Sequence, residues 1–240
     1  MSEVFEVTDE LVGKIEEVLG RGLCKGAGSP SGRMCVEAAV CYAMGLPHGD
    51  DPPCVGEAVR SFKIALNDAE WPSDISRSKG MSKIAIAQLG SVVLDQEKFR
   101  QRLEGKAIRV LLPQLFREAF PSNEKCLQAA TRCEETGSIF SASMAADVVY
   151  AIETGGKNNS LAYRSAQYTH KAAYLLGLDG RHISAVAHSA AYASLATRSA
   201  CVTLTSKYLD IAADLCYEVL QEMESPGAIW IKENGWSFNK

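Results

Sequence analysis

Hydrophobic residues recur along most of this chain three or four positions apart, the spacing of one face of an α-helix. The first such stripe covers 11–19, behind a capping Thr8 and ahead of Gly20 and Gly22. No stretch alternates convincingly between apolar and polar residues, as a half-buried strand would. The pattern therefore predicts an all-α protein, a helical bundle or array.

Caps, glycines and prolines divide the remaining stripes into further helices, about ten in all. Gly105 and Pro113 interrupt the longest stripe, so we expect a kink or a division into two helices there. The expected ranges are 31–44, 53–71, 74–89, 95–120, 123–135, 139–153, 159–176, 181–200 and 203–224.

Alanine becomes more frequent after Pro121, where a helix stop is followed by capping residues. We expect an N-terminal helical region with a Gly/Ser loop over 1–121. An Ala-rich helical array with an aromatic tail would follow over 122–240. The two regions could also form one continuous domain.

Short related motifs recur in the second half. The sequence AADxxY occurs at 145–150 and 212–217, and HxAAY occurs at 170–174 and 188–192. Alanine lets helix axes approach closely, while tyrosine fills gaps and keeps its hydroxyl at a polar edge. The motifs indicate a helical repeat, with His, Asp and Tyr either lining a groove or making interhelical hydrogen bonds in a packed array.

The totals exclude several classes of function. A formal net charge of −4 gives no general basic field, so nucleic acid is an unlikely partner, although a local basic patch remains open. No run approaches the roughly 18 apolar residues of a membrane span. The acidic N-terminus lacks a signal-peptide pattern, so we expect a cytoplasmic protein without a membrane partner.

The 8 cysteines include no C-x-x-C pair, and we expect all of them to be reduced and structural. The alternative is a zinc site built from Cys41, His48 and Cys54, with Cys35 nearby. Structural zinc ligands usually come in closer pairs than these. We therefore expect neither a metal nor a cofactor.

The stretch 26–71 holds the best candidate site. Its loop KGAGSPSGR (25–33) would offer backbone N–H groups and two cations to an anion. It is not a Walker A loop, because it has no G-K-[ST] and no preceding strand. The candidate ligand-binding residues are Gly26, Gly28, Ser29, Ser31, Arg33, Asp50, Asp51 and Arg60.

Glu37 lies inside the apolar run 34–44. A buried carboxylate must be paired, hydrogen-bonded or protonated. Its possible partners are Arg33, Arg60 and Lys63. Either Glu37 is a general base or metal ligand, or it is a structural ion pair or an exposed residue.

Cys35 is expected in the first helical turn, where the helix dipole would lower its thiol pKa and His48 could act as its base. The turn that contains Asp50 and Asp51 is most simply a solvated turn and helix cap. A divalent-ion site there would need further carboxylates, for which Asp68 and Glu70 are the candidates. The acidic turn could equally be a contact surface.

The tail 230–238 contains three large aromatic residues in what we expect to be an irregular segment. Such residues seldom remain in water. We expect the tail to fold back on the helices; docking on a partner is the alternative.

The segments SGRMCVEAAVCYAMGLPHGDDPPCV, RSFKIALNDAEW, KIAIAQLGS and ESPGAIW, with the Ala/Tyr/Asp-rich helices, resemble a group of uncharacterised bacterial and phage proteins. The likeness covers nearly the whole chain, although the Ala-rich half is less regular here. It implies an all-helical fold and a mobile-element context, with no activity attached.

Two functions follow as hypotheses. The first is a non-enzymatic binding protein that holds a protein partner or a small anionic ligand through 26–51 and the concave side of the array. The resemblance suggests phage–host or toxin–immunity conflict as its setting. The alternative is a hydrolase or transferase acting on an anionic substrate, with Glu37 and His48 as catalytic residues. We expect Glu37, His48 and the amides of 26–31 not to share one pocket.

Overall fold

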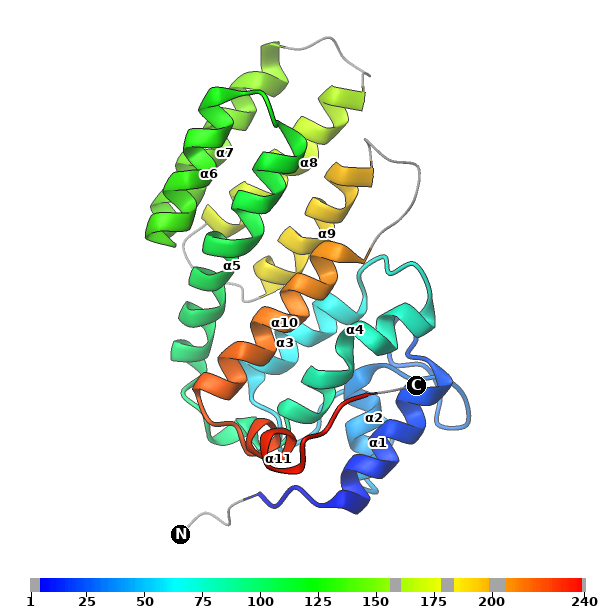
Figure 1. Ribbon diagram of the computed structural model, residues 1–240. Helices are drawn as coiled ribbons and strands as arrows, with labels where there is room; N and C mark the ends of the chain where they lie inside the picture. The colour runs from blue at the N-terminus through cyan, green and yellow to red at the C-terminus, as the bar shows by residue number, and fades with distance from the viewer. Residues whose placement is uncertain (1–4, 156–160, 178–183, 199–205, 239–240) are drawn as a thin grey trace. The chain divides into compact units, whose positions relative to one another are not determined.

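The computed structural model describes residues 5–155, 161–177, 184–198 and 206–238 (Figure 1). These residues form eleven α-helices and one 3₁₀ turn, and no strand occurs among them, which confirms the all-α prediction. None of the described helices is long and apolar enough to cross a membrane. The expected helix ends at 159–160, 181–183, 199–200 and 203–205 lie outside the described residues.

The chain divides into two compact units, one discontinuous in sequence. The first consists of Met1–Arg100 and Ala213–Lys240, and the second of Gln101–Ala212. The boundary expected near Pro121 therefore falls inside the second unit.

The helices of the first unit come from both ends of the sequence. They are α1 (Asp9–Arg21), α2 (Val36–Ala43), α3 (Glu57–Asn67), α4 (Asp74–Ala87), the 3₁₀ turn η1 (Ser91–Val93) and α11 (Pro226–Asn234). The second unit contains α6 (Glu124–Thr136), α7 (Ile139–Gly155), α8 (Leu161–Gly177) and α9 (Ser184–Arg198). Residues of both units belong to α5 (Gln96–Ala119) and α10 (Lys207–Glu222).

Helix α5 is continuous, so the expected division at Gly105 or Pro113 does not occur. Proline removes the N–H that would bond to the Arg109 carbonyl, at a cost of about 3 kcal/mol in a helix interior. Burial of a long apolar stripe on the same helix offsets that cost. The fully buried members of the stripe are Phe99, Leu103, Ala107, Ile108, Leu111, Leu112, Leu115 and Phe116.

Helix α2 begins at Val36, later than the expected start near Ser31. The preceding loop folds back on itself instead. The Cys24 amide donates to the Met34 carbonyl at 3.1 Å, and the Cys35 amide donates to the Ala27 carbonyl at 3.4 Å. Gly28 adopts φ +70°, and a Cβ there would lie 2.2 Å from the Arg33 carbonyl oxygen. These bonds hold the backbone out of the helix until Cys35, which caps it.

Helix α3 also begins later than expected, at Glu57 in place of Pro53. A turn precedes it, in which the Val55 amide donates to the Pro52 carbonyl at 3.1 Å. The N-cap is Gly56, which offers no side chain. Gln96 replaces that side chain by accepting a bond from the Ala58 amide at 3.1 Å.

The Ala-rich helices of the second unit pack closely through small residues. The Ser189 hydroxyl donates to the Ala172 carbonyl at 3.0 Å. A Cβ on Gly177 would lie 2.7 Å from the Cα of Ser143, so α7 and α8 approach closely there. The motif alanines that the structure buries are Ala145, Ala146, Ala172, Ala173, Ala190, Ala212 and Ala213.

The motif tyrosines and histidines behave differently from the alanines. Tyr150 and Tyr174 are each more than half exposed. Their rings flank that of His170, with centroid distances of 5.3 and 6.0 Å. The motifs thus combine buried alanine contacts with aromatic rings at the surface. A duplication remains a prediction.

The C-terminal segment is largely helical, and the expectation of an irregular tail is wrong. Pro226 begins α11 and Gly235, at φ +58°, ends it. The predicted folding back is confirmed by contacts within the first unit. The Gly227 amide donates to the Leu89 carbonyl at 2.9 Å, and the Trp236 indole donates to the Glu16 carboxylate at 2.8 Å. The Ser225 hydroxyl donates to the Ala87 carbonyl at 2.6 Å.

A Gly227→Ala substitution tests this docking. The new Cβ would lie 2.0 Å from the Ile86 carbonyl oxygen. We expect α11 to be pushed off α4, at a cost of about 2 kcal/mol or more in unfolding free energy. Thermal and urea unfolding provide the measurement.

Gly13→Ala is the matched control, because it makes the same change on α1, where no atom lies within 4 Å. That variant should gain about 0.5–1 kcal/mol from helix propensity. Equal stability of the two variants would contradict the close contact of α11 with α4.

Candidate functional site

A small cavity of about 30 Å³ lies in the first unit, between the loop after α1, the start of α2 and the end of α3. This volume suits one or two water-sized groups. The residues around it are Gly26, Ala27, Cys35, Val36, Glu37, Asp50, Ile64, Asn67 and Asp68. Five of these, Gly26, Cys35, Glu37, Asp50 and Asp68, are residues that the sequence singled out.

Glu37 forms a fully buried ion pair. Both its side chain and that of Lys63 are 0% exposed, and the carboxylate Oε1 lies 2.9 Å from the Lys63 Nζ. Lys63 is one of the three partners expected from the sequence. Because Glu37 is on α2 and Lys63 on α3, the pair joins the two helices.

Burial sets the chemistry of this carboxyl group. Removal from water raises the pKa of Glu37 above its ordinary value, and the positive charge of Lys63 acts in the opposite direction. Asp50 adds to the rise, because it places a second negative charge nearby. The charged form of Glu37 therefore depends on Lys63, and the structural interpretation of Glu37 is the one that fits.

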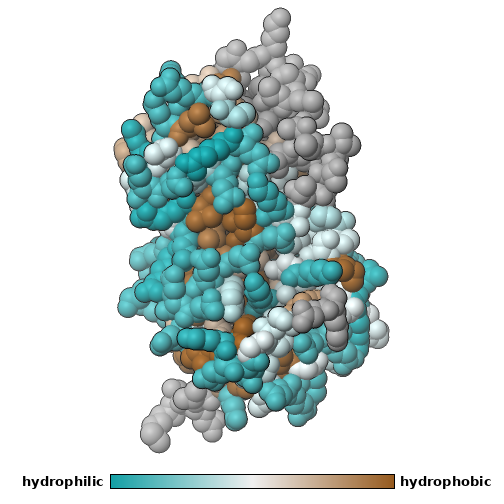
Figure 2. All heavy atoms as spheres, in the orientation of Figure 1, coloured by the Kyte–Doolittle hydropathy of each residue, from teal (hydrophilic) through white to brown (hydrophobic). Residues whose placement is uncertain are grey.

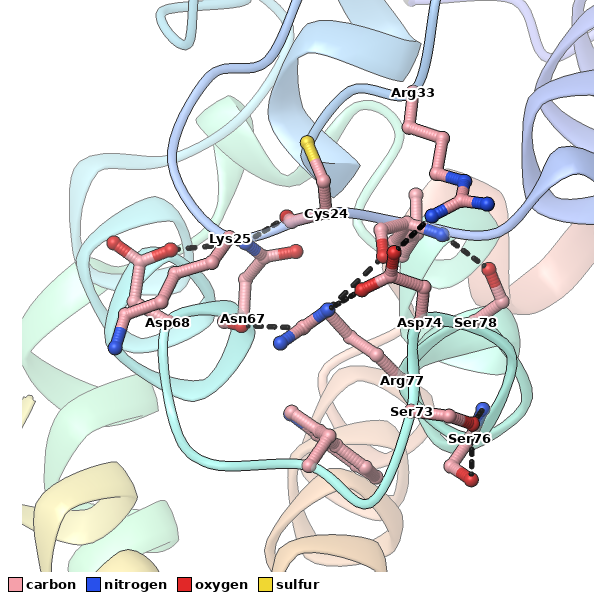
Figure 3. Close-up of polar contacts among 12 residues, drawn as sticks. Cys24, Lys25, Arg33, Asn67, Asp68, Ser73, Asp74, Ser76, Arg77 and Ser78 are labelled. Atoms are coloured by element: carbon pink, nitrogen blue, oxygen red, sulfur yellow. Dashed lines mark hydrogen bonds and ion pairs between the residues drawn. The ribbon is translucent and has the colours of Figure 1, made fainter.

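Asn67 connects α3 to the loop after α1 (Figure 3). Its amide nitrogen donates to the Cys24 carbonyl at 2.9 Å and to Asp68 Oδ1 at 3.0 Å. Asn67 is 1% exposed, yet its side-chain oxygen has no hydrogen-bond partner. Glu37 Oε2 is likewise buried and accepts no hydrogen bond from the described residues. Two residues that line the cavity thus carry a buried oxygen that lacks a donor.

Arg77 of α4 fixes the backbone on which the cavity is built (Figure 3). Its Nε donates to the Asn67 carbonyl at 2.8 Å, and its Nη1 donates to the Leu23 carbonyl at 3.0 Å. Nη1 also donates to the Asp74 carboxylate at 2.6 Å. One buried guanidinium therefore holds the end of α3 and the start of the loop together.

Sequence reasoning missed both Asn67 and Arg77. A signal for Asn67 exists, because it follows Lys63 by four positions and so shares its helix face. Phe62 and Leu66 beside them are fully buried, which marks that face as internal. Arg77 has no comparable signal, since its acceptors are backbone carbonyls.

Two of the backbone donors expected to bind an anion, the amides of Gly26 and Ser29, are used within the protein. The Gly26 amide donates to Asp68 Oδ1 at 2.8 Å, where an anion would have to displace a carboxylate. The Ser29 amide donates to the Arg33 carbonyl at 3.0 Å. The Arg33 side chain pairs with Asp74, and Ser31 lies exposed in the turn. The arrangement therefore gives little support to an anion at this loop.

His48 and Cys35 do not form the pair considered from the sequence. His48 Nε2 lies 3.3 Å from the Gly28 carbonyl oxygen, and His48 is not among the residues that line the cavity. The Cys35 sulfur accepts from the Ala38 amide at 3.3 Å as an N-cap. The expected lowering of its pKa is wrong, because burial raises the pKa of this thiol to about 11.

The acidic turn divides between two roles. Asp50 lines the cavity, whereas Asp51 pairs with Arg60 of α3. Among the described residues, no group of three or more His, Cys, Asp or Glu side chains is placed to hold a metal ion. The seven described cysteines are free thiols, and Cys201 lies outside the described residues.

Comparison of the chain with protein-family models, with curated proteins and with solved structures finds no match. Conclusions about function therefore rest on the geometry of the chain itself.

The buried pair gives a direct prediction. Lys63→Met would leave Glu37 buried without a counter-charge, which typically costs about 3–5 kcal/mol of stability. We expect urea unfolding at neutral pH to show a loss of that size. Adding Glu37→Gln to the same chain should recover more than half of it. If the double variant is no more stable than the single one, the pairing carries no stability.

The same variant should respond to pH. Without Lys63, burial of Glu37 loses its main opposing charge and raises the folded-state pKa of Glu37 further above the ordinary 4.5. The folded state then binds a proton more tightly than the unfolded state, so stability increases as pH falls through this raised pKa. The deficit of Lys63→Met relative to wild type should therefore shrink between neutral pH and the ordinary pKa. A constant deficit would contradict the assignment.

Proposed function

We propose that this chain is a non-enzymatic binding protein, and that its second unit holds an acidic amphipathic helix of a protein partner. A groove between α6 and α7 carries the proposal. Its volume is about 140 Å³. It is lined by Lys125, Gln128, Ala129, Arg132, Ser141, Met144, Ala145 and Val148.

The α7 side of the groove is apolar and open to solvent. Met144 and Val148 line the groove, and Phe140 lies next to it on the same helix face, because the three follow one another at intervals of four. Phe140 is 71% exposed and Met144 is 38% exposed. Figure 2 shows that hydrophobic residues reach the visible surface only as separate patches among hydrophilic ones. Exposed apolar side chains that share one helix face are typical of an interaction surface.

The α6 side of the groove is positively charged. Lys125 and Arg132 line it, both are exposed, and neither forms an ion pair within the described part of the chain. No carboxylate is among the lining residues, although the whole chain has a net charge of −4. A partner that places leucine-like side chains on α7 and carboxylates beside Lys125 and Arg132 would complement both features.

The enzyme alternative has weaker support. Its two central residues, Glu37 and His48, do not meet: Glu37 is paired with Lys63 inside the first unit, and His48 bonds to the Gly28 carbonyl. A protein partner also suits the setting that the sequence resemblance suggests, phage–host or toxin–immunity conflict. We therefore place the function in protein binding.

Two synthetic peptides test the charge preference. Both carry the same leucine stripe at helical spacing; one has glutamates on its other face, and its counterpart has lysines. We expect the acidic peptide to bind and to shift NMR signals of α6 and α7, and the basic peptide to bind at least tenfold more weakly. Equal binding of the two peptides would contradict the proposal.

Charge reversal in the protein completes the test. Lys125→Glu with Arg132→Glu should reverse the preference between the two peptides. Lys79→Glu with Lys232→Glu makes the same change in net charge on exposed residues of the first unit, and it should leave the preference unchanged. If the control pair has as large an effect as the groove pair, overall charge decides binding and the groove does not.

Removal of the aromatic side chain of Phe140 tests the apolar face of α7 beside the groove. Phe140→Ala should weaken binding of the acidic peptide about tenfold, because an exposed aromatic ring contributes most of its energy on being covered. Since the ring is 71% exposed, the unfolding free energy should change little. Unchanged affinity would remove Phe140 from the binding surface.

A further inference from the structure

The cavity at Glu37 offers a second site, independent of the groove on the second unit. We propose that it binds the ammonium group of a small primary amine. The proposal rests on the kind of polar atoms that line the cavity, on their charge and on its size.

Two residues that line the cavity carry unpartnered hydrogen-bond acceptors. Glu37 Oε2 and Asn67 Oδ1 are both buried and lack a hydrogen-bond donor among the described residues. Buried polar groups of this kind normally have a partner. The carboxylates of Asp50 and Asp68 line the same cavity. An occupant must therefore bring N–H or O–H groups, and one with several donors can serve several of these oxygens together.

Charge favours a cation over water. Three carboxylates line the cavity, those of Glu37, Asp50 and Asp68, and no cationic side chain is among the lining residues. Lys63 compensates only one of them, through its pair with Glu37. Two nearby cations are engaged elsewhere, since Arg60 pairs with Asp51 and Lys25 pairs with Glu70. A positive charge in the cavity would reduce the excess of negative charge.

Size and shape favour an ammonium group among cations. A volume of about 30 Å³ accepts a group the size of water, which matches –NH₃⁺ but not a quaternary ammonium. No group of three or more acidic, histidine or cysteine side chains in the described residues can hold a metal ion. An N–H donor reaches an oxygen at about 2.9 Å and so tolerates the wider spacing.

The cavity has a deep end and an entrance. Glu37 and Asn67 are buried, whereas Asp50 is exposed and Asp68 is half-buried. Ala27, Val36 and Ile64 provide apolar wall between them. An amine would enter with its nitrogen first, place its first methylene group against this wall, and leave the rest of its stem near Asp50.

Titration with methylammonium chloride tests the proposal on the full chain. Tetramethylammonium chloride and potassium chloride at equal ionic strength are the comparisons, because neither cation donates a hydrogen bond. We expect methylammonium alone to raise the melting temperature in a saturable way and to shift the NMR signals of the Gly26 amide and the Asn67 side-chain amide. An equal response to the three salts would overturn the proposal.

Asp50→Asn and Asp51→Asn form a matched pair of variants. They remove the same charge from adjacent residues, but only Asp50 lines the cavity. Asp50→Asn should weaken methylammonium binding about fivefold, and Asp51→Asn should change it less than twofold. Equal effects would mean that the cation responds to general surface charge, which would also overturn the proposal. Neither result bears on peptide binding by α6 and α7.

Discussion

The first unit depends on one buried charge pair. Glu37 and Lys63 are both removed from water, and the desolvation cost of each is offset only while the other lies beside it. Apolar contacts would let α2 and α3 slide past each other with small losses, but a buried ion pair tolerates no such shift. The pair therefore fixes the register of α2 on α3. Nearby thiols stay neutral, since burial raises the pKa of Cys35 to about 11 and that of Cys216 to about 12.

One face of α3 provides both the pair and the cavity. Lys63 binds Glu37, and one turn later Asn67 binds the Cys24 carbonyl. The loop after α1 is thereby held at a fixed distance from α2, and the space that remains between them is the cavity. Arg77 secures the backbone behind it by binding the carbonyls of Leu23 and Asn67. The polar contacts thus fix the distances between α2, α3 and the loop after α1. The cavity is the space that these distances leave open.

The spacing of apolar residues and the helix caps predicted the features of the fold that depend on local structure. The helical class, the approximate ranges of α6 to α10 and the folding back of the tail all followed from apolar spacing, caps and glycines. The start of α2 did not, because its loop is shaped by bonds such as Cys24 to Met34 that only folding brings together. Glu37 could be recognised as a buried carboxylate, but the sequence offered three cations without a choice among them.

The candidate chemistry was harder to predict for a related reason. A glycine-rich loop before a helix indicates an anion site, yet here Asp68, distant in sequence, already accepts the Gly26 amide. Position at a helix start suggests a reactive Cys35, but burial by neighbouring segments has the larger effect on its pKa. In both cases the deciding group lies on another element, and its approach is a property of the tertiary structure.

The discontinuity of the first unit has a consequence for how the protein is made. The ribosome synthesises Met1–Arg100 first, then all of Gln101–Ala212, and only afterwards the segment Ala213–Lys240 that contains α11. Until then α4 lacks its partner α11, whose Gly227 amide donates a hydrogen bond to the Leu89 carbonyl just after α4. The contacts that close this unit span most of the sequence, and long-range closure of this kind is slow. The nascent chain therefore carries an unfinished apolar surface through most of its own translation.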